Sequence, residues 1–142
     1  MVKAPADWDA FHRIRRAELF TSKGKMSPYD ENHADDRVPE NTPYLLEVDG
    51  QAVGVARLDR RENIGIIRLV AISATRQGQG LGRILGDLLD REAMVAGIEV
   101  LRVNAGRDVV GFYERLGWKA APWDKSELRG IAANAVQMQK PL

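Results

Sequence analysis

The hydrophobic period of the sequence changes sharply within residues 64–97. Ile64–Ser73 is rich in isoleucine and valine, which is typical of a largely buried strand. After a glycine-rich turn, apolar residues recur every three or four positions up to Gly97, which predicts an amphipathic helix with glycine at its C-terminus. Those apolar residues are Leu81, Ile84, Leu85, Leu88, Leu89 and Met94. Val100–Val103 reads as a strand, and a strand–helix–strand crossover of this kind makes the two strands parallel.

Antiparallel strands are predicted on the N-terminal side of this unit. Tyr44–Val48 and Gln51–Leu58 read as strands, and Asp49-Gly50 between them is a strong hairpin signal. Arg60–Asn63 forms a second polar turn, so that the third strand of an antiparallel meander is Ile64–Ser73.

The remaining elements complete a single domain over residues 1–142. The spacing predicts helices over Trp8–Phe20, with Asp7 as N-cap, and over Asp108–Leu116. A long loop is expected over Thr21–Pro43. Two closing strands are expected at Trp118–Ala121 and Asn134–Gln139. The fold class is therefore α/β (α+β): a mixed, mainly antiparallel twisted sheet with a central parallel strand pair, flanked by helices.

Composition excludes several classes of protein. The chain has no cysteine, which excludes disulfides, thiolate metal sites and cysteine nucleophiles, and we expect no metal cofactor. The formal net charge is +1, which gives no reason to expect nucleic acid or a membrane surface as partner. No stretch approaches the roughly 20 apolar residues of a membrane helix, and the N-terminus does not resemble a signal peptide. We therefore expect a cytoplasmic protein.

The turn between the buried strand and the helix has glycine at alternate positions, in Gln77-Gly78-Gln79-Gly80-Leu81-Gly82. Glycine allows close backbone approach to a ligand, and the first amides of a helix have no internal acceptor, so such a turn can cradle phosphate oxygens. It lacks the Gly-Lys-Ser/Thr of a Walker loop and the spacing of the dinucleotide fingerprint. The alternative is a turn that serves only as a tight connection.

Two segments carry a resemblance to a known family. Arg68-Leu69-Val70-Ala71-Ile72 followed by Gln77-x-x-Gly80-x-Gly82 resembles the acetyl-CoA signature of the GCN5-related N-acetyltransferases, the GNAT superfamily. Gly111-Phe112-Tyr113-Glu114-Arg115-Leu116-Gly117-Trp118 is similar to the late motif of the same family, with tryptophan in place of the usual phenylalanine. The resemblance is specific over residues 64–118 and only topological elsewhere.

The resemblance implies a single GNAT-like domain that uses acetyl-CoA as co-substrate. The strand before the turn is expected to carry a bulge and to splay from its parallel neighbour, so that its free backbone groups bind pantetheine. The residues implied to bind the cofactor are Val70, Ala71, Ile72, Gln77, Gly78, Gly80, Gly82 and Arg83. The family often has asparagine near the start of the late helix, where this chain has Asp108, an expected N-cap. Asn104 is the better polar candidate for a cofactor contact.

The resemblance also implies direct attack of an acceptor amine on the thioester. Tyr113 matches the tyrosine that hydrogen-bonds the departing thiol, and an amide near Ile72 is expected to stabilise the oxyanion. We predict Glu31 as the general base, with His33 as an alternative; other carboxylates considered are Asp30, Glu47, Asp59 and Glu114. Arg68, unusual in a buried strand, is expected to pair with a carboxylate or to reach the sheet face near the ligand.

The predicted function is acetyl transfer to a primary amine of a small molecule or peptide. A non-catalytic acyl-CoA-binding or sensing module is the first alternative, and a nucleotide-binding module is the second. Small enzymes of this family often form homodimers, and Asn134–Leu142 is the segment expected to make such contacts.

Overall fold

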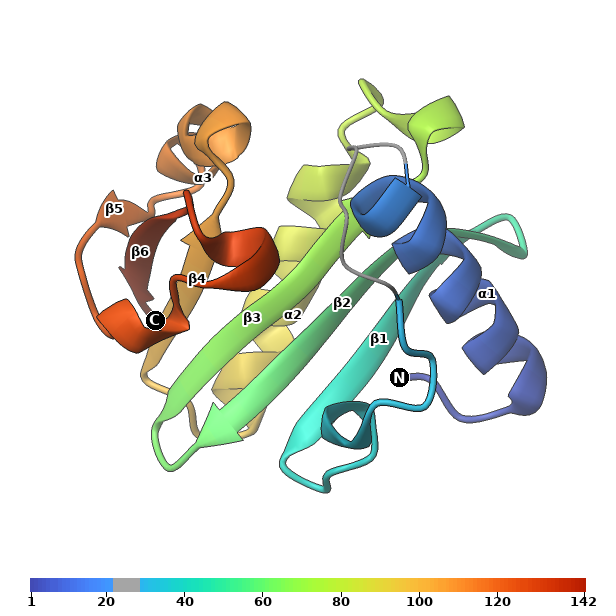
Figure 1. Ribbon diagram of the computed structural model, residues 1–142, viewed down its shortest axis with the longest axis horizontal. Coiled ribbons are helices and arrows are strands. Elements are labelled where there is room, and N and C mark those ends of the chain that lie inside the picture. The colour runs from blue at the N-terminus through green and yellow to red at the C-terminus, as the bar shows by residue number, and fades with distance from the viewer. Residues whose placement is uncertain (22–28) are drawn as a thin grey trace.

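A computed structural model of the protein describes residues 1–21 and 29–142 (Figure 1). Its single sheet has six strands in the order β1-β2-β3-β4-β6-β5. The strands are β1 (Asn41–Val48), β2 (Gln51–Arg61), β3 (Ile64–Ile72), β4 (Val100–Ala105), β5 (Lys119–Ala120) and β6 (Val136–Pro141). Only β3 and β4 are parallel, and every other neighbouring pair is antiparallel. The predicted fold class is confirmed.

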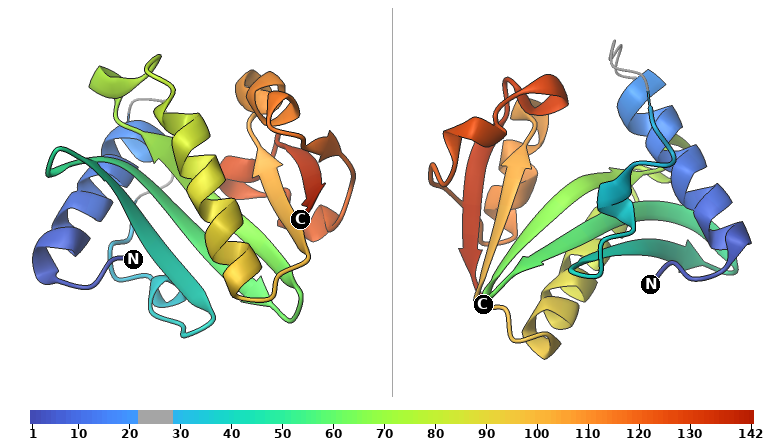
Figure 2. Two further views of the ribbon diagram at one scale, coloured as in Figure 1. Left: turned by 180° about the vertical axis from the view of Figure 1, so that it is seen from behind. Right: turned by 60° about the horizontal axis from the view of Figure 1, so that its bottom comes forward.

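Helices cover both faces of the sheet (Figures 1 and 2). The front face, toward the viewer in Figure 1, carries α1 (Pro5–Arg15), which continues as a π-helical segment, Arg16–Thr21. The back face carries α2 (Leu81–Val95) and α3 (Val110–Arg115). The larger apolar core lies between the sheet and the back helices, and a smaller one lies under α1.

The inner face of α2 is narrower than the sequence predicts. Leu81, Leu85, Leu89 and Ala93 are buried at helical spacing against the sheet. Three residues assigned to the same face are exposed instead, at 48% for Ile84, 42% for Leu88 and 53% for Met94. Because α2 packs against the sheet along one stripe, apolar residues on its flanks stay in solvent.

The predicted end of α2 at Gly97 is confirmed. Gly97 has a φ of 81°, and the Ile98 amide donates to the Ala93 carbonyl at 3.0 Å. This bond, with the 3.1 Å bond from the Gly97 amide to the Met94 carbonyl, forms a Schellman motif.

Several predicted boundaries move. The first helix begins at Pro5, and Asp7 lies in its first turn, where its carboxylate accepts from the amides of Lys3 and Ala4 at 3.2 and 3.1 Å. The prediction of Asp7 as N-cap is therefore wrong, because proline occupies the first helical position. Part of the predicted long loop, residues 22–28, lies outside the described residues. Within the rest is one 3₁₀ turn, Ala34–Asp36.

The boundaries of later elements shift by one or two residues. A 3₁₀ turn, Arg107–Val109, precedes α3, and Asp108 lies inside it, so Asp108 is not the N-cap. β6, predicted at Asn134–Gln139, starts and ends two residues later and inserts between β4 and β5. Dimer contacts by the segment 134–142 stay a prediction.

The parallel pair β3–β4 opens into a fork. Its register runs from Ile64 opposite Val100 to Ile67 opposite Val103 and stops there, although both strands continue. The right-hand view of Figure 2 shows the two halves of the sheet meeting at one end and diverging toward the other. Just beyond the last pair, the β2–β3 register shifts, and Leu69 takes a φ of 53°. A bulge at this point bends β3 away from β4.

Charged side chains form a chain of ion pairs across the front face. In order, its members are Arg15, Asp36, Arg57, Asp59, Arg68 and Glu127. The first four are at most 5% exposed. Burial by itself would lower the pKa of Arg57, but its bonds to Asp59 and Asp36 raise that pKa. These ion pairs connect α1 to β2, to β3 and to the loop before β6. The prediction that Arg68 pairs with a carboxylate is confirmed, because it binds Asp59 and Glu127.

Candidate active site

A cleft of about 640 Å³ occupies the open end of the fork. β3 contributes residues 67–70 to its wall, and β4 contributes 103–105. Leu19 closes one side, and the segment before β6, at Gly130 and residues 132–135, closes another. Tyr113 reaches the cleft from α3. The splay of two parallel strands thus turns a sheet edge that would otherwise be buried into a ligand-sized opening.

The last residues of β3 present an edge without a strand partner. Opposite β4, the ladder ends at Ile67, so residues 68–72 pair with no described strand on that side, and residues 68–70 line the cleft. Val70 packs toward the back core and Ala71 toward the front core, as alternation in a strand requires. The Ile72 carbonyl accepts from Gln77 Nε2 at 3.0 Å, which anchors the glycine turn to the strand.

The glycine turn exposes backbone to solvent. Gly78 and Gly80 have φ of 80° and 76°, and a Cβ at either would meet nothing within 4 Å, so conformation rather than space requires glycine there. Gly82 differs, because its Cβ would lie 3.1 Å from Phe112. Gly80 caps α2 without a side-chain bond, and Ile84 is the first amide to bond back, at 3.2 Å. The amides at the start of α2 therefore have no backbone acceptor within the helix, and they lie beside the exposed Arg83.

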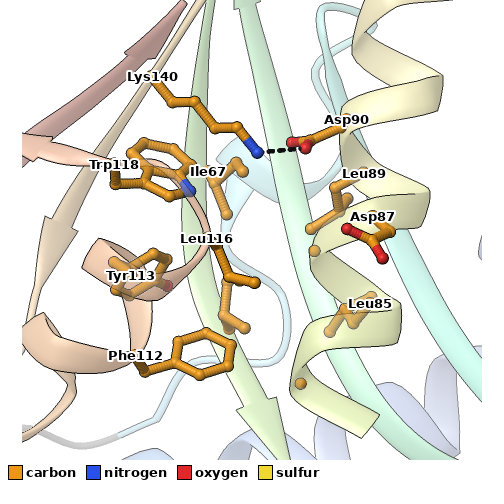
Figure 3. Close-up of a pocket in the computed structure, with 13 residues that line it drawn as sticks. Ile67, Leu85, Asp87, Leu89, Asp90, Phe112, Tyr113, Leu116, Trp118 and Lys140 are labelled. Carbon is orange, nitrogen blue, oxygen red and sulfur yellow. Dashed lines mark hydrogen bonds and ion pairs between the residues drawn. The ribbon is translucent and has the colours of Figure 1, made fainter. Parts of the chain in front are cut away.

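Tyr113 lies between the back core and the cleft. Its ring packs edge-to-face with Phe112 and Trp118, with centroids 5.3 and 5.4 Å away (Figure 3). Across a narrow gap, these rings face Leu85 and Leu89 of α2. Burial raises the pKa of the Tyr113 hydroxyl to about 12. The phenol therefore stays protonated throughout the neutral range and can act as a hydrogen-bond donor.

The predicted bases lie apart from the cleft wall. Glu31 forms an exposed ion pair with Arg16 at 2.8 Å, and His33 caps the 3₁₀ turn by accepting from the Asp35 amide at 3.1 Å. Asp59, another carboxylate considered as the base, is buried at 1% exposure and bound to two arginines. Glu31 as general base stays a prediction, and the structure does not bring it to Tyr113.

Asn104 lies in the cleft wall together with residues that the sequence does not single out. Gln137, on β6, donates to Asn104 Oδ1 at 3.0 Å and holds the backbone of Trp123 and Asp124. Trp123 in turn donates from its indole to the Val103 carbonyl at 3.2 Å. The partners are 20 and 33 residues apart in the chain. No local pattern marks such contacts, so only the paired strands reveal them.

A splayed parallel strand pair next to a glycine-capped helix is the architecture of the GNAT-like acyl-CoA N-acyltransferase fold. A profile of the acetyltransferase (GNAT) domain matches residues 23–142. The chain therefore belongs to the GNAT acetyltransferase family.

Solved structures share the fold at low sequence identity. The ribosomal-protein-S18-alanine N-acetyltransferase of Escherichia coli matches with a TM-score of 0.77 and 20% identity, over 99% of this chain and 91% of that one. N-acetylglutamate synthase of Neisseria gonorrhoeae, solved with coenzyme A and N-acetyl-glutamate, matches with a TM-score of 0.79 and 19% identity. The match covers 100% of this chain and 34% of that one. Tetrahymena GCN5 matches with a TM-score of 0.73 and 12% identity, over 94% of this chain and 85% of that one.

A curated relative matches over a shorter stretch. The Bacillus subtilis (strain 168) protein BSU40680, whose name assigns it provisionally as an acetyltransferase, is 30% identical over 69 residues. This alignment covers 49% of the present chain and 47% of that protein, so the chain matches about half the length of its relative.

Among the residues that the structure describes, no helix is both long and apolar enough to cross a membrane. The same part of the chain brings together no group of three or more histidine, cysteine or acidic side chains that could hold a metal ion.

Proposed function

We propose that the protein transfers the acetyl group of acetyl-CoA to a primary amine of a small molecule or peptide. The observation that carries this proposal is the continuous path from the glycine turn, along the unpaired edge of β3, to the hydroxyl of Tyr113. In acetyl-CoA, the pyrophosphate, the pantetheine arm and the thioester follow one another in this order. The glycine turn, the edge of β3 and the Tyr113 hydroxyl follow one another in the same order and would bind these three parts.

The residues present fit the coenzyme. The unpaired amides at the start of α2, with Gly78, Gly80 and Arg83 beside them, suit a pyrophosphate. Residues 70–72 offer backbone groups that pair with an amide-bearing chain as an added strand would. When bound, the coenzyme supplies an activated acetyl thioester.

The protein must lower the free-energy cost of two events, deprotonation of the acceptor amine and formation of the oxyanion. A lysine-like amine has a pKa near 10.4, so the neutral form needed for attack costs about 4.6 kcal/mol at pH 7. The amine nitrogen forms a bond to the acyl carbon, the carbonyl oxygen becomes an oxyanion, and the carbon–sulfur bond then breaks. A free amide of β3 beside the bulge, near Ile72, is placed to donate to the oxyanion.

Tyr113 then stabilises the thiolate that leaves. With the tyrosine pKa at about 12 and a thiol near 8.5, full proton transfer from phenol to thiolate is uphill by about 5 kcal/mol. A hydrogen bond to sulfur needs no such transfer. The proton of the attacking amine therefore leaves to a base or to water.

Replacing Tyr113 by phenylalanine should lower kcat about 30-fold, because one hydrogen bond to a developing charge is lost. The affinity for acetyl-CoA should change less than about threefold, since the ring packing is kept. Steady-state thiol release gives kcat, and calorimetry gives the affinity. In the wild type, no loss of activity from Tyr113 ionisation is expected up to about pH 10, because its raised pKa keeps the hydroxyl protonated there. An unchanged kcat in the variant would remove Tyr113 from the mechanism.

Calorimetry with acetyl-CoA and with desulfo-CoA tests the central proposal. Both should bind with similar affinity, because most contacts are to the pyrophosphate and pantetheine arm. Binding without turnover of any primary amine would favour the alternative, a non-catalytic acyl-CoA-binding module. If neither compound binds, the glycine turn is only a connection and the proposed function is wrong.

A further inference from the structure

Two side chains at the root of the fork each have an N–H donor that bonds to none of the described residues. The β3–β4 register ends at Ile67 opposite Val103, so Arg68 and Asn104 are the first unpaired positions on each strand. Ile67 and Val103 point into the back core, so the next residues point to the front. Both Arg68 and Asn104 line the cleft.

The orientation of the Asn104 amide is set by its neighbour. The Oε1 atom of Gln137 accepts from the backbone amides of Trp123 and Asp124 at 2.8 and 3.0 Å, which requires oxygen at that position. Its Nε2 therefore donates, to the Asp124 carbonyl at 2.6 Å and to Asn104 Oδ1 at 3.0 Å. Nδ2 of Asn104 is left as a donor without a partner among the described residues.

Arg68 is held just as firmly. Its Nε donates to Asp59 Oδ2 at 2.9 Å and its Nη1 to Glu127 Oε1 at 2.5 Å. Asp59 is itself fixed by two bonds from Arg57. The Nη2 group of Arg68 has no hydrogen-bond partner in the part of the chain that the structure describes. Two fixed donors thus lie at the first unpaired positions of β3 and β4 on the front side, whereas α2 and α3 lie on the back.

We propose that Arg68 Nη2 and Asn104 Nδ2 bind an acyl oxygen of the acceptor, either a carboxylate or an amide carbonyl next to the reactive amine. The acceptor is then an α-amino acid or a peptide N-terminus, not a simple alkylamine. This inference rests on the proposed function and names its substrate class. It also assigns Asn104 to the acceptor, where the sequence suggests a cofactor contact.

The chemistry of such an acceptor suits this cleft. The α-amino group of a peptide has a pKa of 7.7–8.0, against 10.4 for a lysine side chain, so about 300 times more of it is neutral at pH 7. Among the described residues that line the cleft, Asp108, at the start of the α3 region, is the one carboxylate. Because roughly a tenth of a peptide α-amino group is already neutral at pH 7, its attack depends less on a strong base.

Three amines with the same branched skeleton test the proposal. Alanine carries a carboxylate, alaninamide carries an amide carbonyl, and isopropylamine has a methyl group in their place. We expect kcat/KM, corrected for the fraction of neutral amine, to be at least tenfold higher for one or both acyl compounds than for isopropylamine. Preference for alanine indicates free amino acids, and preference for alaninamide indicates peptide N-termini.

Variants locate the effect. Asn104→Leu removes the donor at nearly constant volume and should bring the ratio of acyl compound to isopropylamine to within about threefold, through KM for the amine. Arg68→Lys, which keeps a charge beside Asp59, should lower the same ratio. Asn63→Leu is the control, because Asn63 binds Glu99 in the turn at the other end of β3. Calorimetry with acetyl-CoA shows which variants are folded.

Equal rates for the three amines, turnover of none of them by a protein that binds acetyl-CoA, or an unchanged ratio in Asn104→Leu would each overturn the proposal. A separate titration of the ¹⁵N-labelled protein with the same amines, without acetyl-CoA, follows the side-chain amide signal of Asn104. It should shift with the acyl compounds only. If acetyl-CoA does not bind, the proposed function fails, and this titration decides the acyl-oxygen site independently.

Discussion

Gly80→Glu should weaken acetyl-CoA binding by on the order of a thousandfold. Gly80 has a φ of 76° and caps α2, so a side chain there costs about 1–2 kcal/mol in backbone strain. The new carboxylate also lies beside the unpaired amides that are expected to hold the pyrophosphate, where it competes with and repels that group. Calorimetric titration of acetyl-CoA into both proteins measures the change.

The matched control for this change is Gly97→Glu, at the other end of the same helix. Gly97 has a φ of 81°, and the nearest atom to a Cβ there, on Arg60, is 3.8 Å away. Backbone strain is therefore similar, but no ligand is expected at this end. The control should lose stability and keep its acetyl-CoA affinity. Similar affinity losses in both variants would mean that strain, and not the phosphate site, explains the effect at Gly80.

Asp59→Asn should lower the free energy of unfolding by about 3–5 kcal/mol, because it leaves three arginines with two carboxylates and so one positive charge without a counter-charge in a largely buried set of ion pairs. Asp59 is 1% exposed and accepts from Arg57 and Arg68. Asparagine has nearly the same shape, so the change removes charge rather than volume. Urea unfolding at pH 7 measures the loss.

Asp90→Asn is the corresponding control on the back of the molecule. Asp90 pairs with Lys140 at 2.5 Å and joins α2 to β6, as Figure 3 shows, and its side chain is 17% exposed. Its loss should cost about 1 kcal/mol or less, since water solvates the partner that remains. If both variants lose the same amount, burial of the ion-pair chain is not what makes it important for stability.

Local sequence patterns predicted turns and helix ends well where the backbone conformation at a position requires a particular type of residue. Asp49-Gly50 forms the hairpin because both residues take positive φ, at 51° and 79°. Gly97 ends its helix for a similar reason. The predictions fail where burial depends on the packing of another element. Ile84 and Leu88 follow the helical period and were predicted to be buried, but the sheet covers only one stripe of α2 and leaves them exposed.

The candidate site divides in the same way. The glycine turn and Tyr113 each lie in a contiguous segment, the alternating glycines and the run that resembles the late motif of the family, so local sequence was enough to single them out. Their roles in binding acetyl-CoA and in catalysis stay predictions. The partners of Arg68 and Asn104 were not predictable, since Glu127 and Gln137 are 59 and 33 residues away along the chain. A charge in a strand indicates that a partner exists, and only the packing of distant segments says which one.

From the sequence alone follow the order of strands and helices, the parallel crossover and the position of the glycine turn, because hydrophobic period and glycine conformation act over a few residues. The tertiary structure decided the width of the fork, the insertion of β6 between β4 and β5, and the orientation of the donors at the root of the cleft. Those features depend on where a ladder stops and on hydrogen bonds between segments far apart in the chain. These hydrogen bonds stabilise the protein only when the whole sheet has formed.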